Sequence, residues 1–335
     1  MADFLPMMYQ DSPITKVLQE STTFNFATTV SDYCNYSCHY CWPGAHAGTM
    51  KLPPPTDIFK HNIKKYCKWV KKHNPKIENF YFHYSGGEPS MFPHMSDYLK
   101  FVADEIPNGY SGLQTNGSRT IRWWEKNLPN LHSLSISVHV GSADPNHLIE
   151  LAKLCEEHKV DYNLNVAADL RNKKKVLKFL ELFSKNNLQT GFHLIQEIHE
   201  TWDDNDLHTN KEFYEACDSF TAHYQDRNSN SELQRKVTFE TEDSKKPIKF
   251  DEMQRSSMRG DWTGYDCNTP AQFMMINSQG HLYISCGNKI GPLIKKIDLF
   301  KSKLSVIPAQ PWVRCTTGYC KCTGLWHANK QLVIK

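Results

Sequence analysis

The chain has 335 residues, enough for about two domains of ordinary size. Its net charge of +3 argues against a protein that chiefly coats nucleic acid, because such proteins present a strongly basic face. Residues Met1 to Ser12 lack the basic start and apolar run of a signal peptide, and no stretch approaches the roughly 18 apolar residues of a spanning helix. We therefore expect a cytoplasmic protein with no membrane segment.

Between residues 20 and 200, short apolar runs alternate with longer segments of helical periodicity. Strands are predicted at Phe24–Thr29, Asn79–Tyr84, Tyr110–Gln114, Ser133–His139, Tyr162–Ala167 and Gly191–Ile195. Helices are predicted near 55–74, 93–106, 119–127, 145–158 and 172–186. Six strands that alternate with helices indicate parallel βα units, so we predict an α/β barrel over 20–200 that follows an N-terminal segment, 1–19.

The pattern changes after residue 200. Polar, loop-like stretches flank a predicted helix at Lys211–His223, and we interpret 201–260 as a linker or lid. In the last part of the chain, 261–335, two apolar runs at Phe273–Asn277 and His281–Ser285 flank Ser278-Gln279-Gly280. That arrangement predicts a β-hairpin.

The distribution of the eleven cysteines indicates metal binding, because disulfides are rare in a reducing compartment. One group lies near the N-terminus: Cys34, Cys38 and Cys41. A second group lies near the C-terminus: Cys267, Cys286, Cys315, Cys320 and Cys322. The other three, Cys67, Cys155 and Cys217, fall in helical patterns, where we expect them to be buried core residues.

Three closely spaced thiolates can hold three corners of an iron–sulfur cube. The spacing Cys34-x3-Cys38-x2-Cys41 would leave the fourth iron without a protein ligand, so that a small molecule could chelate it. The alternative is a structural zinc site, which closes with four ligands; His39 or His46 would supply the fourth.

The surroundings of these cysteines favour an active site. They follow the first predicted strand, at the end of a βα barrel where active sites lie. Ser85-Gly86-Gly87-Glu88-Pro89 follows the second predicted strand at the same end. The glycines would let the backbone approach a ligand closely, and Glu88 could meet a cationic group. The alternative is an ordinary tight turn.

Together these motifs resemble the radical S-adenosylmethionine (SAM) superfamily, whose hallmarks are CxxxCxΦC, with Tyr40 at the aromatic position, and a GGEP turn, Gly86–Pro89. Thr115-Asn116-Gly117 and Leu134-Ser135-Ile136-Ser137 extend the resemblance over roughly 20–200. It implies a partial (β/α)6 radical SAM barrel, followed by a small cysteine-rich C-terminal extension that contains the β-hairpin.

The resemblance also implies site residues. Cys34, Cys38 and Cys41 would bind a [4Fe–4S] cluster, and SAM would chelate its fourth iron. The turn formed by Gly86, Gly87, Glu88 and Pro89 would meet the SAM amino group, and the backbone near Tyr40 would meet the adenine; Ser137 and Asn165 would contact ribose or carboxylate. His139 stands where many relatives carry Asp, and either faces the substrate or has a structural role.

The C-terminal cysteines resemble the Twitch and SPASM extensions of this superfamily, which bind auxiliary [4Fe–4S] clusters. Five cysteines fit one such cluster, with the choice of four ligands among Cys267, Cys286, Cys315, Cys320 and Cys322 left open. A structural zinc knuckle is the alternative for this region.

The implied reaction begins with an electron from a reductant such as flavodoxin or ferredoxin. Reductive cleavage of SAM gives a 5′-deoxyadenosyl radical, which abstracts hydrogen from a small metabolite or peptide. An auxiliary cluster that accepts an electron would make the outcome an oxidation or a cross-link. Because the barrel begins near residue 20, with no recognition domain before it, we expect a small molecule or short peptide.

Substrate-lining residues are expected from the last two strands and include His193 and Glu197. Glu197 is a candidate acid, base or anchor, with a structural salt bridge as the alternative. Two other functions compete with this one. A nucleoside or tRNA modification enzyme is disfavoured by the near-neutral charge. A non-catalytic cluster-binding scaffold is disfavoured by the intact SAM-binding motifs.

Overall fold

The computed structural model describes residues 14–19, 21–41, 46–49, 51–195, 210–225, 237–241, 245–248, 265–283, 297–301, 312–314 and 330–332. Within these residues the chain forms two sheets. The larger sheet has the order β13-β12-β11-β2-β3-β4-β5-β6-β7, and the smaller has the order β14-β10-β15-β1-β8-β9.

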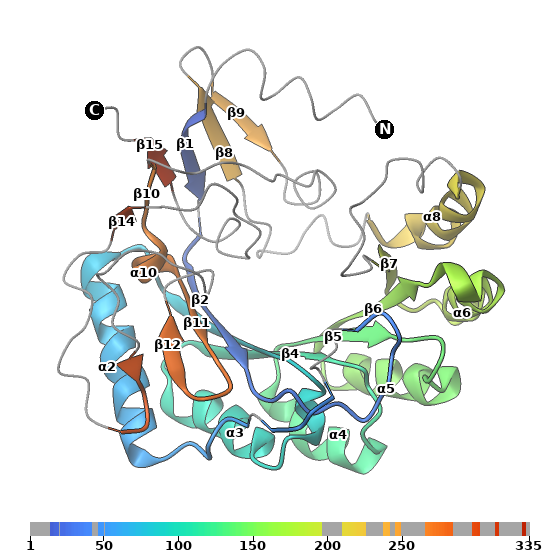
Figure 1. Cartoon of the computed structure of the whole chain (residues 1–335), viewed down its shortest axis with the longest axis horizontal. Coiled ribbons are helices and arrows are strands. Elements are labelled where there is room, and N and C mark those ends of the chain that lie inside the picture. The colour runs from blue at the N-terminus through green and yellow to red at the C-terminus, as the bar shows by residue number, and fades with distance from the viewer. Residues whose placement is uncertain are drawn as a thin grey trace.

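Six consecutive parallel strands form most of the larger sheet. They are β2 (Thr23–Thr29), β3 (Asn79–Ser85), β4 (Gly109–Thr115), β5 (Ser133–Val138), β6 (Asp161–Ala168) and β7 (Thr190–Leu194). The helices between them are α2 (Asp57–His73), α3 (Met95–Glu105), α4 (Ile121–Asn127), α5 (Pro145–Glu157) and α6 (Lys173–Lys185). Figure 1 shows these helices on the outer side of a curved sheet. The predicted partial barrel is therefore confirmed.

The two faces of the sheet differ in chemistry because side chains alternate along each strand. On β5, Leu134, Ile136 and Val138 are buried, and the intervening serines are only half-buried. On β3, Phe80, Phe82 and Tyr84 alternate in the same way with Asn79, Tyr81, His83 and Ser85. An apolar face therefore packs under the helices, and a polar face lines the concave side.

The helices bury matching apolar stripes. In α2 the buried residues Phe59, Ile63, Tyr66, Cys67 and Val70 recur at helical spacing. The helix begins at Asp57 because the Thr56 side chain accepts a hydrogen bond from the backbone N–H of Phe59. Cys155 in α5 and Cys217 in α8 (Lys211–Gln225) are fully buried, and Cys67 is 7% exposed, so the prediction that these three cysteines are core residues is confirmed.

The predicted C-terminal hairpin is present as β11 (Phe273–Ile276) and β12 (His281–Tyr283), which pair antiparallel. Gly280 lies in the turn between them with a φ of +76°. The structure adds a feature that the sequence pattern did not indicate: β11 pairs parallel with β2. The hairpin, with β13 (Ile297–Asp298) beside β12, therefore extends the barrel sheet.

The smaller sheet joins distant parts of the chain. Its central strand, β1 (Ile14–Gln19), pairs antiparallel with β15 (Lys330–Leu332) on one side and with β8 (Val237–Thr241) on the other. β10 (Tyr265–Cys267) lies between β15 and β14 (Val313–Arg314), and β9 (Lys245–Ile248) pairs with β8. In Figure 1, β1, β8 and β9 lie beyond the barrel, on the side away from α3 and α4.

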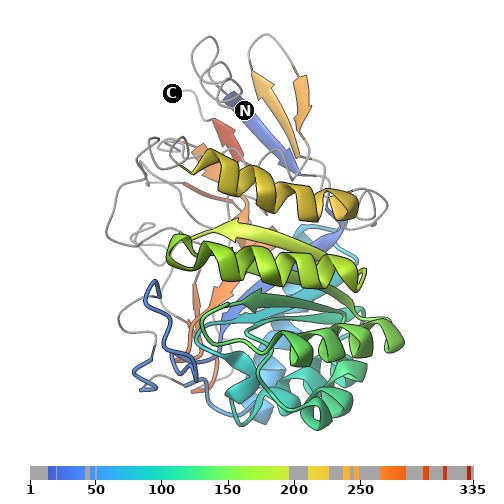
Figure 2. The same cartoon turned by 90° about the vertical axis from the view of Figure 1, so that its right-hand side faces the viewer.

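Helix α8, predicted within the linker segment, contacts α6 and β7. Figure 2 shows α8 running alongside α6. No helix in the described part of the chain has the length and apolar character needed to cross a bilayer.

Two side chains of α2 and the side chain of its C-cap residue, Asn74, donate hydrogen bonds to carbonyl groups in the C-terminal part of the chain. The Tyr66 hydroxyl donates to the carbonyl of Pro270 (2.8 Å), the Asn62 amide to that of Leu299 (2.9 Å), and the Asn74 amide to that of Ala271 (3.3 Å). These bonds fix the C-terminal residues against the barrel.

We predict that Tyr66→Phe lowers the free energy of unfolding by about 1–2 kcal/mol, because it leaves the Pro270 carbonyl without its donor in a buried place. Urea unfolding measures the change. Tyr110→Phe removes a hydroxyl from a side chain that is 39% exposed and should change stability by less than about 0.5 kcal/mol. Equal effects of the two substitutions would contradict this account.

Candidate active site

The loop that carries Cys34, Cys38 and Cys41 starts directly after β2, at the carboxyl-terminal edge of the sheet. Both of its ends are held: the Val30 N–H donates to the Ser85 carbonyl (2.9 Å), and the Leu52 N–H donates to the Val30 carbonyl (2.8 Å). Ser31 also forms an antiparallel bridge with Lys51. We call residues 31–51 the cysteine loop. All three thiols are free; Cys34 and Cys38 are half-buried and Cys41 is exposed.

The Gly86-Gly87 turn packs against the start of this loop. Both glycines have positive φ, +91° and +48°. A Cβ at position 87 would lie 2.1 Å from the carbonyl oxygen of Tyr33, and a Cβ at position 86 would lie 2.9 Å from that of Ser31. The Glu88 N–H donates to the same Tyr33 carbonyl (2.7 Å). The glycines are thus required by the approach of the loop backbone, next to Cys34.

The Glu88 side chain is 1% exposed and points into the fold. Its carboxylate accepts hydrogen bonds from the Ser90 N–H (2.9 Å), the Thr115 hydroxyl (2.5 Å) and the Asn116 N–H (2.5 Å). Burial raises the pKa of Glu88, and these donors oppose the increase. The carboxylate therefore joins the end of β3 to the end of β4.

Two further contacts lie between the loop and the ends of β5 and β6. The Tyr40 hydroxyl and His139 Nδ1, just after β5, share a hydrogen bond of 2.8 Å, and their rings stack at 5.8 Å. His39 Nε2 lies 3.7 Å from the carboxylate of Asp169, a buried residue just after β6. The sequence interpretation did not identify Asp169; its only signal was its position two residues after the end of a predicted strand.

His139 is neutral at physiological pH. Burial, and secondly the nearby imidazole of His193, lower the pKa of His139 to about 4. Burial also lowers the pKa of His193, in β7. The structure thus brings together Tyr40, His139 and His193, which the sequence had placed on separate segments.

Ser137 and Asn165 are register partners on β5 and β6, both on the concave face. Neighbouring positions on this face are also polar: Ser135 pairs with Asn163, whose amide donates to the Asn165 side chain (3.3 Å). The concave face below the cysteine loop therefore presents hydroxyl and amide groups.

The three thiols lie near enough to one another to interact electrostatically. Burial raises the pKa of Cys34, the Tyr36 N–H (3.4 Å from its sulfur) lowers it, and Glu88, Cys38 and Cys41 raise it further. Such mutual repulsion between thiolates is relieved by a cationic group placed among them. The donor set of three thiolates on one anchored loop fits an iron–sulfur cube.

A closed zinc site needs four ligands that converge on one ion. In the described residues, no group of three His, Cys, Asp or Glu side chains is placed in this way. His39, one of the two candidate fourth ligands, lies against Asp169 instead.

Several predicted site residues lie outside the described part of the chain: Glu197, Cys286, Cys315, Cys320 and Cys322. Cys267 is described. It is 7% exposed at the end of β10, its sulfur lies 2.7 Å from the Thr269 hydroxyl, and its register partner is Val313 on β14. β14 ends at Arg314, the residue before Cys315 in the sequence.

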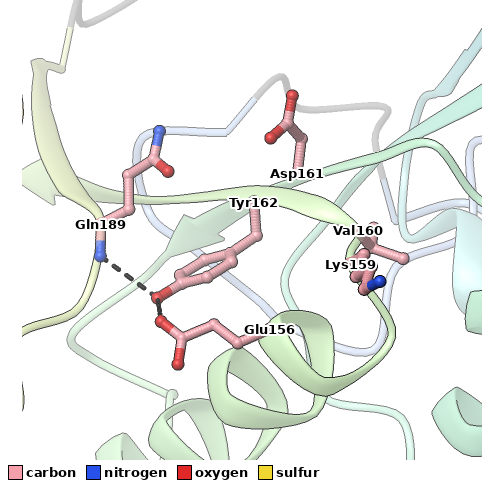
Figure 3. Close-up of a pocket in the computed structure, with 6 residues that line it drawn as sticks. All are labelled: Glu156, Lys159, Val160, Asp161, Tyr162 and Gln189. Carbon is pink, nitrogen blue, oxygen red and sulfur yellow. Dashed lines mark hydrogen bonds between the residues drawn. The ribbon is translucent and has the colours of Figure 1, made fainter. Parts of the chain in front are cut away.

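A hollow of about 350 Å³, whose lining residues are drawn in Figure 3, lies at the start of β6. It is lined by Glu156, Lys159, Val160, Asp161, Tyr162 and Gln189. The Tyr162 hydroxyl donates to Glu156 (2.8 Å) and accepts from the Gln189 N–H (3.3 Å). Strand β6 starts here and ends beside Asp169, roughly 23 Å away at about 3.3 Å per residue. This hollow is therefore separate from the cysteine loop.

A parallel βα barrel with an anchored three-cysteine loop at the carboxyl ends of its strands defines a class of cluster-dependent enzymes. The sequence model of the radical SAM superfamily matches residues 28–198, just over half of the chain. The chain belongs to the radical SAM superfamily of enzymes. No curated protein matches the chain.

Solved structures share the fold at low sequence identity. A histidine-tagged form of anSMEcpe with bound AdoMet is 15% identical over 84% of this chain and 79% of that chain, with a TM-score of 0.53. SuiB of Streptococcus suis bound to S-adenosylmethionine is 16% identical, with a TM-score of 0.48; the match covers 84% of this chain and 62% of the SuiB chain. The present chain thus spans less than two thirds of the length of SuiB.

We predict that Gly87→Ala lowers the free energy of unfolding by about 3 kcal/mol, because its Cβ meets backbone atoms of residues 32 and 33 at a positive φ. Iron uptake should fall in parallel, since the displaced backbone leads into Cys34. Urea unfolding and iron analysis test this. Gly141→Ala is the matched control, because a Cβ there meets nothing within 4 Å. Normal stability of Gly87→Ala would refute the packing argument.

His139 should make stability depend on pH. Its pKa is about 4 in the folded chain and about 6.5 when unfolded, so the unfolded chain binds more protons between these values. The contribution of His139 to the free energy of unfolding is therefore fully present above pH 6.5. It decreases by up to about 3 kcal/mol as the pH falls towards 4.

Urea unfolding of the cluster-free protein at pH 7.5, 5.5 and 4.5 measures this loss. His139→Gln should reduce the pH dependence and leave the part that comes from His193, whose pKa is also lowered by burial, whereas His61→Gln, on the exposed side of α2, should leave it as in the wild type. If His139→Gln retained the full pH dependence, the assignment would be wrong.

Proposed function

We propose that Cys34, Cys38 and Cys41 hold a [4Fe–4S] cluster with one iron free of protein ligands, and that SAM binds that iron. The anchored loop at the carboxyl-terminal edge carries this proposal, because it combines three free thiols with an adjacent glycine turn. Family membership supports it. When bound and reduced, the cluster would supply the electron for reductive cleavage of SAM, the chemistry that generates a radical able to remove hydrogen from a substrate.

The residues of the barrel would hold SAM in place. The turn Gly86–Pro89 offers backbone groups to the amino group, while the Glu88 side chain keeps the turn in position. Ser137 and Asn165, side by side on the concave face, would bind the ribose or carboxylate. The backbone of Tyr40 would meet the adenine, and the hydrogen bond to His139 would fix that part of the loop.

We propose a small metabolite or a peptide as the substrate. The hydroxyl and amide side chains of the concave face, such as Ser135 and Asn163, suit a molecule that offers several hydrogen bonds. His139 and Glu197 are the proposed acid–base or anchoring residues. His139 is neutral and its Nδ1 is held by the Tyr40 hydroxyl, which supports an anchoring role for this residue.

For the C-terminal part, 261–335, we propose an auxiliary [4Fe–4S] cluster of the Twitch or SPASM kind, with four ligands from Cys267, Cys286, Cys315, Cys320 and Cys322. The pairing of Cys267 with Val313 supports this, because it brings Cys267 near the strand that precedes Cys315. Such a cluster would accept an electron, giving an oxidised or cross-linked product. Residues 201–260 would form a lid or linker, and flavodoxin or ferredoxin would be the reductant.

The test is anaerobic reconstitution, followed by iron and sulfide analysis and by assay of 5′-deoxyadenosine after addition of dithionite and SAM. The wild type should hold about eight irons and cleave SAM. A variant with Cys34, Cys38 and Cys41 all changed to Ala should keep about four irons and lose cleavage. Cys67→Ala, which changes a core cysteine, is the control: it should still hold about eight irons and cleave SAM as the wild type does.

Two results would change the proposal. Tightly bound zinc with no SAM cleavage in the wild type would refute the first cluster. About four irons with normal cleavage would keep the first cluster and remove the auxiliary one.

A further inference from the structure

We propose that the side-chain amide of Asn116 donates a hydrogen bond to the thiolate of Cys34 and thereby makes the first cluster easier to reduce. This inference rests on the proposed function, because it takes Cys34 as a cluster ligand. It assigns a role to Asn116, in the Thr115-Asn116-Gly117 segment.

Asn116 lies directly after β4 and is 3% exposed. Its Nδ2 atom is 2.9 Å from Asn35 Oδ1 and 3.9 Å from Cys34 Sγ. A primary amide carries two N–H donors, so one can serve each acceptor. The contact to sulfur is long, as hydrogen bonds to the larger sulfur atom are.

The orientation of this amide is fixed by its other atoms. Oδ1 accepts from the Ser118 N–H (3.0 Å), and the backbone N–H donates to the buried carboxylate of Glu88 (2.5 Å). A flipped amide would place Oδ1 against Asn35 Oδ1 and the Cys34 sulfur, and would turn its NH2 towards the Ser118 N–H. The network therefore keeps donors, and not an acceptor, directed at Cys34.

Cys34 has a second donor, the Tyr36 N–H at 3.4 Å, which belongs to the cysteine loop itself. Asn116 differs because it comes from the barrel and is held by Glu88. It therefore joins the loop to the rigid sheet and supplies a fixed positive dipole in a half-buried place.

The effect on reduction follows from charge. Reduction adds an electron, and part of that negative charge falls on the sulfur ligands. Hydrogen bonds to these sulfurs stabilise the reduced state more than the oxidised state, and so raise the reduction potential. Removing the Asn116 donor should therefore favour the oxidised cluster.

The experiment is a redox titration of the reconstituted full-length chain, followed by electron paramagnetic resonance. The signal of the first cluster is the one absent when Cys34, Cys38 and Cys41 are all changed to Ala. Asn116→Leu removes both donors at similar size. At a fixed potential, we expect its ratio of reduced to oxidised cluster to fall about tenfold, which is 59 mV for a one-electron couple. Asn116→Asp places an acceptor and a negative charge there and should shift the potential further in the same direction.

Asn35→Ala is the matched control, because it breaks the bond to Asn116 at 2.9 Å and leaves the N–H donor to sulfur in place. Its potential should equal that of the wild type. If Asn116→Leu takes up no iron, Asn116→Ser, whose hydroxyl does not reach Cys34, is measured instead and should show the same loss.

An unchanged potential in an Asn116 variant with an intact first cluster would overturn the inference, and so would an equal shift in Asn35→Ala. These failures are distinct from failure of the proposed function, in which the wild type itself would hold no reducible cluster or leave SAM intact.

Discussion

The buried carboxylate of Glu88 is the interaction on which the site depends. A carboxylate taken out of water is unfavourable unless hydrogen bonds replace its hydration, and here donors from Ser90, Thr115 and Asn116 do so. Together they fix the ends of β3 and β4 relative to each other. The backbone N–H of the same residue holds Tyr33, so the position of Cys34 follows from the position of Glu88.

The rest of the cysteine loop is attached to the barrel in the same manner. Tyr40 binds His139 after β5, and His39 lies against Asp169 after β6. With Glu88 and Asn116, these contacts connect one loop to the carboxyl ends of four neighbouring strands. Surface loops are ordinarily mobile, and a catalytic cluster needs fixed ligands, so these contacts hold the described residues 31–41, which carry the three cysteines, against the barrel.

Much of this arrangement could be predicted from the sequence because its signals are local. In the barrel strands, apolar residues alternate with polar ones. In the helices, apolar residues recur every three or four positions, and both periods can be read in short stretches of sequence. The cysteine spacing and the GGEP turn are likewise local. The pairing of β1 with β15 and of β11 with β2 joins segments hundreds of residues apart, and no periodicity within either segment specifies its partner.

Roles within the site were harder to predict than its location. The glycines at 86 and 87 are expected to admit a ligand, and what the structure shows at these positions is the close approach of the backbone of residues 31–33. Glu88 is expected to meet a cation, and the structure adds that its carboxylate accepts three donors of the fold. Asn116 and Asp169 are ordinary polar residues in the sequence, and their importance arises only from which loop atoms lie beside them.

The central claim is that the anchored cysteine loop holds a cluster with one iron open to SAM. Electron–nuclear double resonance on the reduced protein tests it most directly, with SAM that carries 15N in its amino group. The account predicts a hyperfine coupling between that nitrogen and the cluster, lost when Cys34, Cys38 and Cys41 are changed to Ala. A reduced cluster whose spectrum shows no coupling and does not change when SAM is added would contradict it.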